Sequence, residues 1–173
     1  LGTRNGAVLS QGSAVDDVPQ PDRVVIGSDD EAAARRVAAL YVDCGAPIMV
    51  TDPASAETCK YAANAFLAAK LSFTNAIAAV CEAVGADAND VLLGMGYDHR
   101  IGHEFLRPGP GWGGSCFPKD SRAIISIAED AGYDFALMRG VIQANDEQFD
   151  RIVRKVESVT SLDGATVGVL GIA

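Results

Sequence analysis

The chain has little positive charge and few aromatic side chains for its 173 residues. It contains 14 Lys and Arg against 23 Asp and Glu, for a formal net charge of −9, and 6% of its residues are aromatic. A nucleic-acid surface needs clustered Lys and Arg, so this balance argues against a nucleic-acid partner. An anionic ligand would have to be met by a few positioned cations and backbone N–H groups.

The four cysteines, Cys44, Cys59, Cys81 and Cys116, form no CxxC pair and have no regular spacing. This argues against a zinc site or a disulfide framework and favours a reducing cytoplasm. The first three fall in Ala-rich helical patterns and are expected to be packing residues. No stretch of about 18 apolar residues runs free of polar groups, so we expect no membrane partner.

Residues 1–51 are predicted to be the C-terminal remnant of an α/β domain. A β-rich run at 23–27 is followed by an Ala-rich helical pattern at 31–43, which Gly45 ends, and by a second apolar run at 47–50. This order predicts a strand–helix–strand unit. Two strands and a helix do not make a stable sheet alone, so the pattern suggests that upstream chain is missing.

A single long helix is predicted from Pro53 to Val84. Asp52 can cap it, Pro53 suits its first turn, and no further Gly or Pro occurs before Gly85. Its apolar residues lie around most of its circumference, so it must be buried on more than one side, and a second copy of the chain is the expected cover. These residues are Phe66, Leu67, Leu71, Phe73, Ile77 and Val80.

Two more helices are predicted near 118–131 and 135–159, which completes a central helical domain at 52–160. Residues 161–173 are expected to hold the first strand of a truncated further domain. The predicted fold is therefore mainly α, with a β-α-β tail before the helices and a single-strand stub after them.

The loop before the second helix carries the strongest chemical signal. Four glycines within residues 109–114 let the backbone approach a ligand closely. Cys116 lies beside Pro118, a plausible first helical residue, so the helix dipole and nearby Lys119 would favour a thiolate. A thiolate is the nucleophile that attacks a carbonyl group. A tight glycine-rich turn with a buried cysteine is the structural alternative.

Lys60 and Asn64 lie four residues apart, on one face of the long helix. An ammonium and a carboxamide aimed at one point can stabilise an oxyanion. A solvated polar stripe is the alternative. His99 and His103 share the same spacing, but no third ligand stands at a suitable distance in sequence, so no metal site is expected.

Four blocks of the sequence together resemble the UDP-glucose/GDP-mannose dehydrogenase family. They are Glu57-x-x-Lys60-x-x-x-Asn64, Ser72-Phe73-x-Asn75, Asp98-x-Arg100-Ile101-Gly102 and Gly111-x-Gly113-Gly114-Ser115-Cys116-Phe117-Pro118-Lys119-Asp120. The resemblance implies a Rossmann-type NAD-binding domain ending at residue 51, a central dimerisation domain at 52–160, and a nucleotide-binding domain beginning at 161–173. It also implies a homodimer through helix 53–84.

The resemblance further implies a four-electron oxidation of a sugar C6 alcohol. The alcohol gives a hydride to NAD, a cysteine matching Cys116 captures the aldehyde, a second hydride leaves a thioester, and water releases the carboxylate. Lys60 and Asn64 match residues that stabilise the oxyanion, and Asp120 matches a supporting acid–base group.

The resemblance also assigns residues that bind the substrate and the cofactor. Arg100 matches an arginine that reaches the substrate of the neighbouring subunit, and Cys116 and Lys119 match positions near the cofactor. The sugar is expected to contact Lys60 and Asn64 and to be wrapped by Phe105, Leu106, Arg107, Gly109, Gly111 and Gly113.

The sequence departs from the family pattern at several points. The glycine-rich NAD fingerprint and the nucleotide-binding domain are absent, Ala7 stands where the family has a glutamate, and Ala76 stands where glutamate is expected. UDP-glucose is favoured as substrate by Trp112 and Phe117-Pro118, with GDP-mannose or UDP-N-acetylmannosamine as alternatives. A catalytically inactive dimerisation module is the alternative of a different class.

Overall fold

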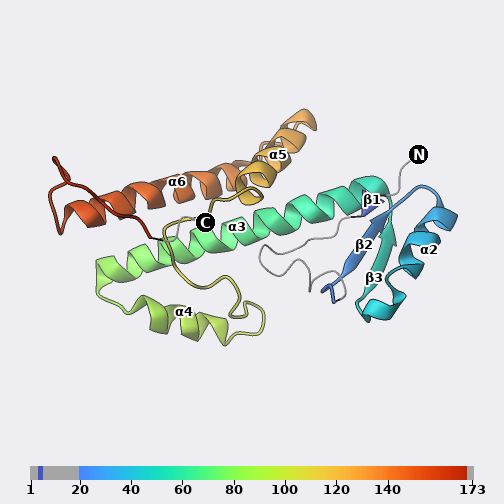
Figure 1. The fold of residues 1–173 in the computed structure, drawn as a ribbon, viewed down its shortest axis with the longest axis horizontal. Helices are drawn as coiled ribbons and strands as arrows, with labels where there is room; N and C mark the ends of the chain where they lie inside the picture. The colour runs from blue at the N-terminus through green and yellow to red at the C-terminus, as the bar shows by residue number, and fades with distance from the viewer. Residues whose placement is uncertain (1–3, 6–19, 171–173) are drawn as a thin grey trace.

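The computed structural model describes residues 4–5 and 20–170. A small sheet lies at one end of the molecule, and one long helix, α3, runs from it along the length of the remaining helices (Figure 1). The position of Ala7, where the family glutamate is expected, falls outside the described residues.

The sheet has three strands in the order β1-β2-β3. Strand β2 (Val24–Gly27) pairs in parallel with β3 (Ile48–Thr51) and antiparallel with the two-residue β1 (Arg4–Asn5). Helix α2 (Glu31–Ala39) connects the parallel strands, and its buried Ala34 packs with β2. The predicted strand–helix–strand unit is confirmed, whereas β1 was not predicted.

Helix α2 is shorter than its sequence pattern predicts. Its backbone stops at Ala39, and a short 3-10 turn, Val42–Cys44, precedes Gly45. Gly45 has φ of 68°, a left-handed conformation that glycine adopts without steric cost. The chain therefore turns toward β3 at Gly45, as expected, but through a 3-10 turn rather than a continued α-helix.

Helix α3 spans Pro53–Val84, as predicted. The Asp52 side chain accepts a hydrogen bond from the backbone N–H of Ser55, and Gly85 ends the helix with φ of 76°. The start of α3 abuts the end of β2, since a Cβ on Gly27 would lie 2.7 Å from the Cβ of Ala56. This close approach ties the sheet to the helical part.

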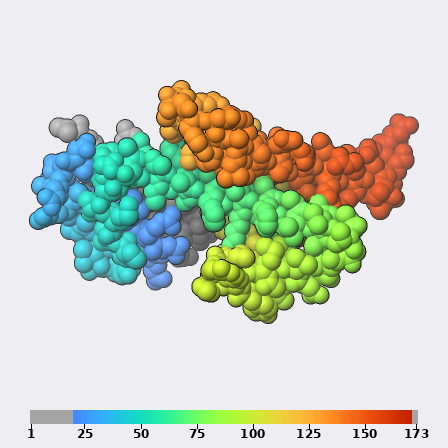
Figure 2. Space-filling model, turned by 180° about the vertical axis from the view of Figure 1, so that it is seen from behind, coloured from blue at the N-terminus to red at the C-terminus, as the bar shows by residue number. Residues whose placement is uncertain are grey.

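Helices α5 (Phe117–Asp130) and α6 (Ala136–Glu157) pack on α3, as expected from the two predicted helices. The short α4 (Ala88–Gly96), which was not predicted, lies on the other side of α3 (Figures 1 and 2). The core between α3, α5 and α6 is built from the buried residues Ala65, Ala68, Trp112, Met138 and Val141.

Helix α3 is long and apolar enough to cross a membrane by length and composition. A core helix of a soluble protein meets the same criterion. In this structure α3 packs on α4, α5 and α6 and buries Asn64 and Asn75, which hydrogen-bond to other segments. These contacts tie α3 to its neighbours, while 28% of its most apolar window is buried.

The strand expected at the C-terminal end does not form over residues 166–170. A lone strand leaves its backbone N–H and C=O groups without a neighbour, and no strand within residues 4–5 and 20–170 pairs with this segment. Residues 171–173 lie outside the described residues.

Candidate active site around Cys116

Cys116 is the N-cap residue of α5 and is exposed. The helix begins at Phe117, so Pro118 is its second residue rather than its first. The Cys116 carbonyl accepts a 2.9 Å hydrogen bond from the backbone N–H of Asp120, and its sulfur lies 3.7 Å from the Ser115 hydroxyl. The thiol is therefore held at a helix N-terminus and is accessible, which excludes the alternative of a buried cysteine.

Asn64 of α3 reaches across to Asp120 of α5. Its side-chain amide donates a 2.6 Å hydrogen bond to Asp120 Oδ2, and the two residues are 6% and 1% exposed. The other carboxylate oxygen, Oδ1, accepts no hydrogen bond from any residue that the structure describes, and the Lys119 ammonium lies 3.4 Å away as its ion-pair partner. Because Asn64 is buried and paired, it does not belong to a solvated stripe.

Lys60 lies one helical turn before Asn64 and is half-buried. Its ammonium makes no hydrogen bond or ion pair with the described residues. Lys119 is 70% exposed beside the thiol-bearing turn. Hydrogen bonds thus link the side chain of Asn64 to Asp120 and the backbone of Asp120 to Cys116. Lys60 is close in sequence to Asn64, and Lys119 is close to Cys116.

Arg100 is folded back onto Asp98 in the described chain. Its Nε lies 3.0 Å from Asp98 Oδ1, and its terminal nitrogen lies 2.6 Å from Oδ2. This pairing lowers the pKa of Asp98 and raises that of Arg100. The guanidinium is 78% exposed, and its reach to the substrate of a neighbouring subunit stays a prediction.

The loop between α4 and α5 is held against α3 by three polar side chains. Lys70 donates to the carbonyl of Ile101 at 2.8 Å, and Thr74 lies 3.2 Å from the carbonyl of Phe105. Asn75 accepts a 2.8 Å hydrogen bond from the backbone N–H of Gly109. Phe105 has φ of 61°, a strained conformation for a bulky residue, which these contacts hold in place.

Helix α6 holds the same loop from the opposite side. Gln148 donates to the carbonyl of Gly109 at 2.7 Å, and Asn145 hydrogen-bonds both backbone groups of Trp112. Gly111 fits against Phe149 because it has no Cβ, which would lie 2.7 Å from Phe149 Cε1. The N–H groups of Gly109 and Trp112 are therefore already paired, whereas the N–H groups of Gly111 and Gly113 make no hydrogen bond with the described residues.

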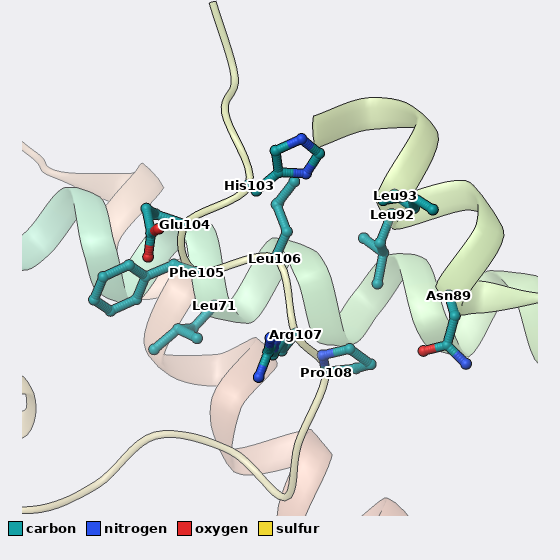
Figure 3. Close-up of a pocket in the computed structure, with 10 residues that line it drawn as sticks. All are labelled: Leu71, Asn89, Leu92, Leu93, His103, Glu104, Phe105, Leu106, Arg107 and Pro108. Atoms are coloured by element: carbon teal, nitrogen blue, oxygen red, sulfur yellow. The ribbon is translucent and has the colours of Figure 1, made fainter. Parts of the chain in front are cut away.

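A cavity of about 720 Å³ opens between the loop and α4. In Figure 3, Glu104 and Phe105 lie on one side of the loop, and Asn89, Leu92 and Leu93 of α4 lie on the other. Three of the predicted substrate residues, Phe105, Leu106 and Arg107, line this cavity, and Cys116 does not. The described chain thus separates the hollow beside α4 from the thiol.

The residues that anchor the loop between α4 and α5 were not predicted from the sequence. Asn145 and Gln148 are polar residues three apart on a helix whose inward face is otherwise apolar, and this pattern was the available signal. His99 and His103 do not converge: His99 is 94% exposed, and His103 packs edge-on against Tyr97.

Residues 54–147 match the model of the UDP-glucose/GDP-mannose dehydrogenase family, central domain. Over 170 residues the chain is 49% identical to the UDP-glucose 6-dehydrogenase TuaD of Bacillus subtilis, an alignment that covers 98% of this chain and 37% of that relative. The chain thus spans well under half of its relative's length.

Solved structures give the same assignment. The UDP-glucose dehydrogenase of Pyrobaculum islandicum superposes with a TM-score of 0.87 at 39% identity, over 90% of this chain and 36% of that one. A GDP-mannose dehydrogenase of Pseudomonas aeruginosa superposes with a TM-score of 0.56 at 30% identity, over 90% of this chain and 36% of that one. The family-model match covers more than half of the chain, and the chain therefore belongs to the UDP-glucose/GDP-mannose dehydrogenase family.

Proposed function

We propose that the chain supplies the nucleophile and part of the sugar site of an NAD-dependent UDP-glucose 6-dehydrogenase. The observation that carries the proposal is the exposed Cys116 at the start of α5, one helical turn before Asp120, whose carboxylate is buried and hydrogen-bonded to Asn64. Support for UDP-glucose comes from the relatives' names and from the higher TM-score of the UDP-glucose dehydrogenase.

In this proposal Cys116 captures the C6 aldehyde of the sugar. Its sulfur forms a bond to C6, the carbonyl oxygen takes a proton, and a thiohemiacetal results. The Lys60 ammonium and the Asn64 carboxamide, both on α3, stabilise the negative charge on the carbonyl oxygen as the C–S bond forms. After oxidation to the thioester, water attacks C6, the C–S bond breaks, and the thiol and the sugar carboxylate are released.

Asp120 is proposed as the supporting acid–base group. Its Oδ2 is occupied by Asn64, whereas the buried Oδ1 accepts no hydrogen bond within the described part of the chain. A buried carboxylate oxygen without a donor is costly, so a water or a substrate hydroxyl that donates to it would be bound favourably.

The sugar nucleotide is proposed to contact the loop before Cys116. Phe105, Leu106 and Arg107 line the cavity. Gly111 and Gly113 offer backbone N–H groups that no described residue accepts from. The N–H of Gly109 already donates to Asn75, so the proposed contact of Gly109 with the sugar nucleotide is through its carbonyl, which accepts from Gln148 and has a second acceptor site.

The described residues fit the nicotinamide end of NAD but not its pyrophosphate. Bound NAD would accept the hydrides. Cys116 and Lys119 are exposed at the start of α5 and can face a nicotinamide. The turn before α2 offers no pyrophosphate site, because the Asp30 carboxylate already accepts from the N–H groups of Ala32 and Ala33. A second carboxylate at that turn, Asp29, adds further negative charge.

We further propose a homodimer through α3, in a reducing cytoplasm. Four apolar side chains on this helix are more than half exposed. They are spaced seven or four residues apart, which places them in one stripe along the helix. They are Phe66 (68%), Phe73 (53%), Val80 (56%) and Val84 (72%).

The test has two parts. NADH formation is followed with the chain, NAD and UDP-glucose, with GDP-mannose as comparison and Cys116→Ser as control. In parallel, each sugar nucleotide is tested for protection of Cys116 against alkylation, which needs no turnover. We expect UDP-glucose to slow alkylation of Cys116, and turnover, where it occurs, to vanish in Cys116→Ser.

An inactive dimerisation module is the second candidate. Ala76, which is exposed on α3 where the resemblance implies a glutamate, favours it. No turnover and no protection by either sugar nucleotide, together with a stable dimer, would establish the module and overturn the enzymatic proposal.

A further inference from the structure

Trp112 is held by one side chain at both of its backbone groups. Its N–H donates to Asn145 Oδ1 at 2.7 Å, and its carbonyl accepts from Asn145 Nδ2 at 2.9 Å. Asn145 is 3% exposed, so its amide is shielded from bulk solvent. A buried amide that satisfies both groups of one residue fixes the position and the orientation of that peptide.

The indole of Trp112 is fixed by a second contact, to α3. Its Nε1–H donates to the Ser72 hydroxyl at 2.8 Å, and that hydroxyl donates to the carbonyl of Val141 at 3.0 Å. Trp112 is 6% exposed within the core cluster. The side chain and the backbone of this loop residue are therefore tied to α3 and α6 together.

Trp112 also contacts the residue that begins α5. Its ring and that of Phe117 lie 6.3 Å apart between centroids, at an interplanar angle of 73°. The segment between them contains Gly113, Gly114 with φ of 75°, Ser115 and Cys116. Glycines give such a segment many conformations, so its shape depends on how firmly its two ends are held.

We infer that Asn145 and Ser72 are positioning residues for Cys116, acting through Trp112. Together they hold one end of the turn at residues 113–116, while α5 holds the other end, and the thiol is thereby kept in one orientation toward the Asn64–Asp120 pair. The consequence for catalysis rests on the proposed function; the restraint on the turn does not.

The polarity of this contact supports a positioning role over simple packing. The neighbouring inward-facing residues of α6, Met138 and Val141, are apolar, and an apolar residue in place of Asn145 would serve packing as well. A polar pair inside a core selects one arrangement of the groups it joins, because any other arrangement leaves buried groups unpaired.

Trp112 is the sole tryptophan of the chain, so its fluorescence reports on the restraint directly. The test compares the native chain with Asn145→Asp, which keeps the side-chain size but replaces the donor to the Trp112 carbonyl with an acceptor. Gln143→Ala, an exposed position on the same helix, is the matched control. Ser72→Ala and Ser72→Thr form a second pair, in which Thr keeps the hydroxyl.

Three readouts are taken: iodide quenching of Trp112, hydrogen exchange of residues 106–117, and the rate and pH profile of Cys116 alkylation. In Asn145→Asp and Ser72→Ala we expect stronger quenching, exchange in the loop faster by on the order of tenfold, and an alkylation rate changed by about threefold or more. Gln143→Ala should match the native chain, and Ser72→Thr should restore most of the native behaviour.

Exchange of the α3 amides serves as the control for global destabilisation and should stay at the native level. The inference is overturned if quenching and loop exchange rise while the rate and pH profile of Cys116 alkylation stay native. It is also overturned if α3 exchange rises in parallel with that of the loop, since the effect is then general unfolding. Neither outcome depends on turnover, so a failed NADH assay with these restraint effects intact counts against the proposed function alone.

Discussion

The side-chain amide of Asn64 on α3 donates a 2.6 Å hydrogen bond to Asp120, four residues after Cys116 on α5. It is the only side-chain donor that the carboxylate of Asp120 has within hydrogen-bond geometry among the described residues. This contact fixes the helix that begins at the thiol against the long helix, and its removal has a specific expected cost.

Replacing Asn64 with Leu should lower the free energy of unfolding by about 2–4 kcal/mol, because a buried carboxylate loses its donor. The measurement is urea denaturation. The double variant Asn64→Leu/Asp120→Leu should recover part of the loss, since neither buried group is then unpaired. Losses that simply add in the double variant would contradict the coupling.

Gly111→Ala should destabilise the chain by about 2–4 kcal/mol, from overlap and backbone strain together. Its new Cβ would lie 2.7 Å from Phe149 Cε1, and its φ of 119° is unfavourable for alanine. Gly113→Ala is the matched control, since a Cβ there meets nothing within 4 Å, and it should change stability little. Equal melting temperatures for the two variants would argue against the tight fit of the loop on α6.

The sequence predicts the helix bounds well where capping and terminating residues are present. Asp52, Pro53 and Gly85 define both ends of α3, and the structure has the same bounds. Helix α4 was missed because it has only nine residues and contains two glycines, which hide its apolar pattern. Residues 166–170 are not in a strand in this structure, and a strand depends on a neighbour that local sequence does not supply.

The position of Cys116 at the start of a helix was predictable from the sequence, whereas the contacts that support the surrounding loop were not. Glycine-rich spacing before Cys116 indicates an accessible thiol, and the structure has one. The link from Asn64 to Asp120 spans 56 residues, and that from Asn145 to Trp112 spans 33, so both depend on how three helices pack. Local periodicity holds no information on such contacts.

Cys116 should be alkylated faster than the other cysteines near neutral pH. It is exposed, Cys81 is 4% exposed, and Cys44 and Cys59 are half-buried. Iodoacetamide labelling of the native chain, followed by peptide mass spectrometry, gives the four rates, and labelling in urea removes the differences due to folding. Native labelling of Cys59 or Cys81 as fast as that of Cys116 would remove the main support for a preformed thiol site.

Stability should fall below about pH 4.5 partly through Glu82, whose ordinary pKa is 4.5. Hydrogen bonds from Lys155 and Arg151 of α6 lower its pKa in the folded chain. Stabilisation by a group with a lowered pKa is present above the unfolded pKa and is lost as the pH falls through the folded pKa. Glu82→Gln should therefore flatten the stability profile in the acid range.

The control for Glu82 is Glu147→Gln, which removes an exposed carboxylate that forms no ion pair with the described residues. Urea denaturation across the acid range gives both profiles. If the free energy of unfolding has the same pH dependence in Glu82→Gln and Glu147→Gln, the ion pairs of Glu82 with α6 do not contribute to stability in the acid range.

The exposed stripe on α3 should hold two copies of the chain together. Phe66 and Phe73 lie seven residues apart and are 68% and 53% exposed, which is unfavourable for aromatic side chains in water. Phe66→Glu/Phe73→Glu should give a monomer by sedimentation at micromolar concentration, where the native chain sediments as a dimer. Ile127→Glu, at an apolar position of α5 that is 53% exposed and outside this stripe, is the matched control and should stay dimeric. A native chain that sediments as a monomer at that concentration would refute the dimer, and a dimer that survives both Glu substitutions would move the interface to another face.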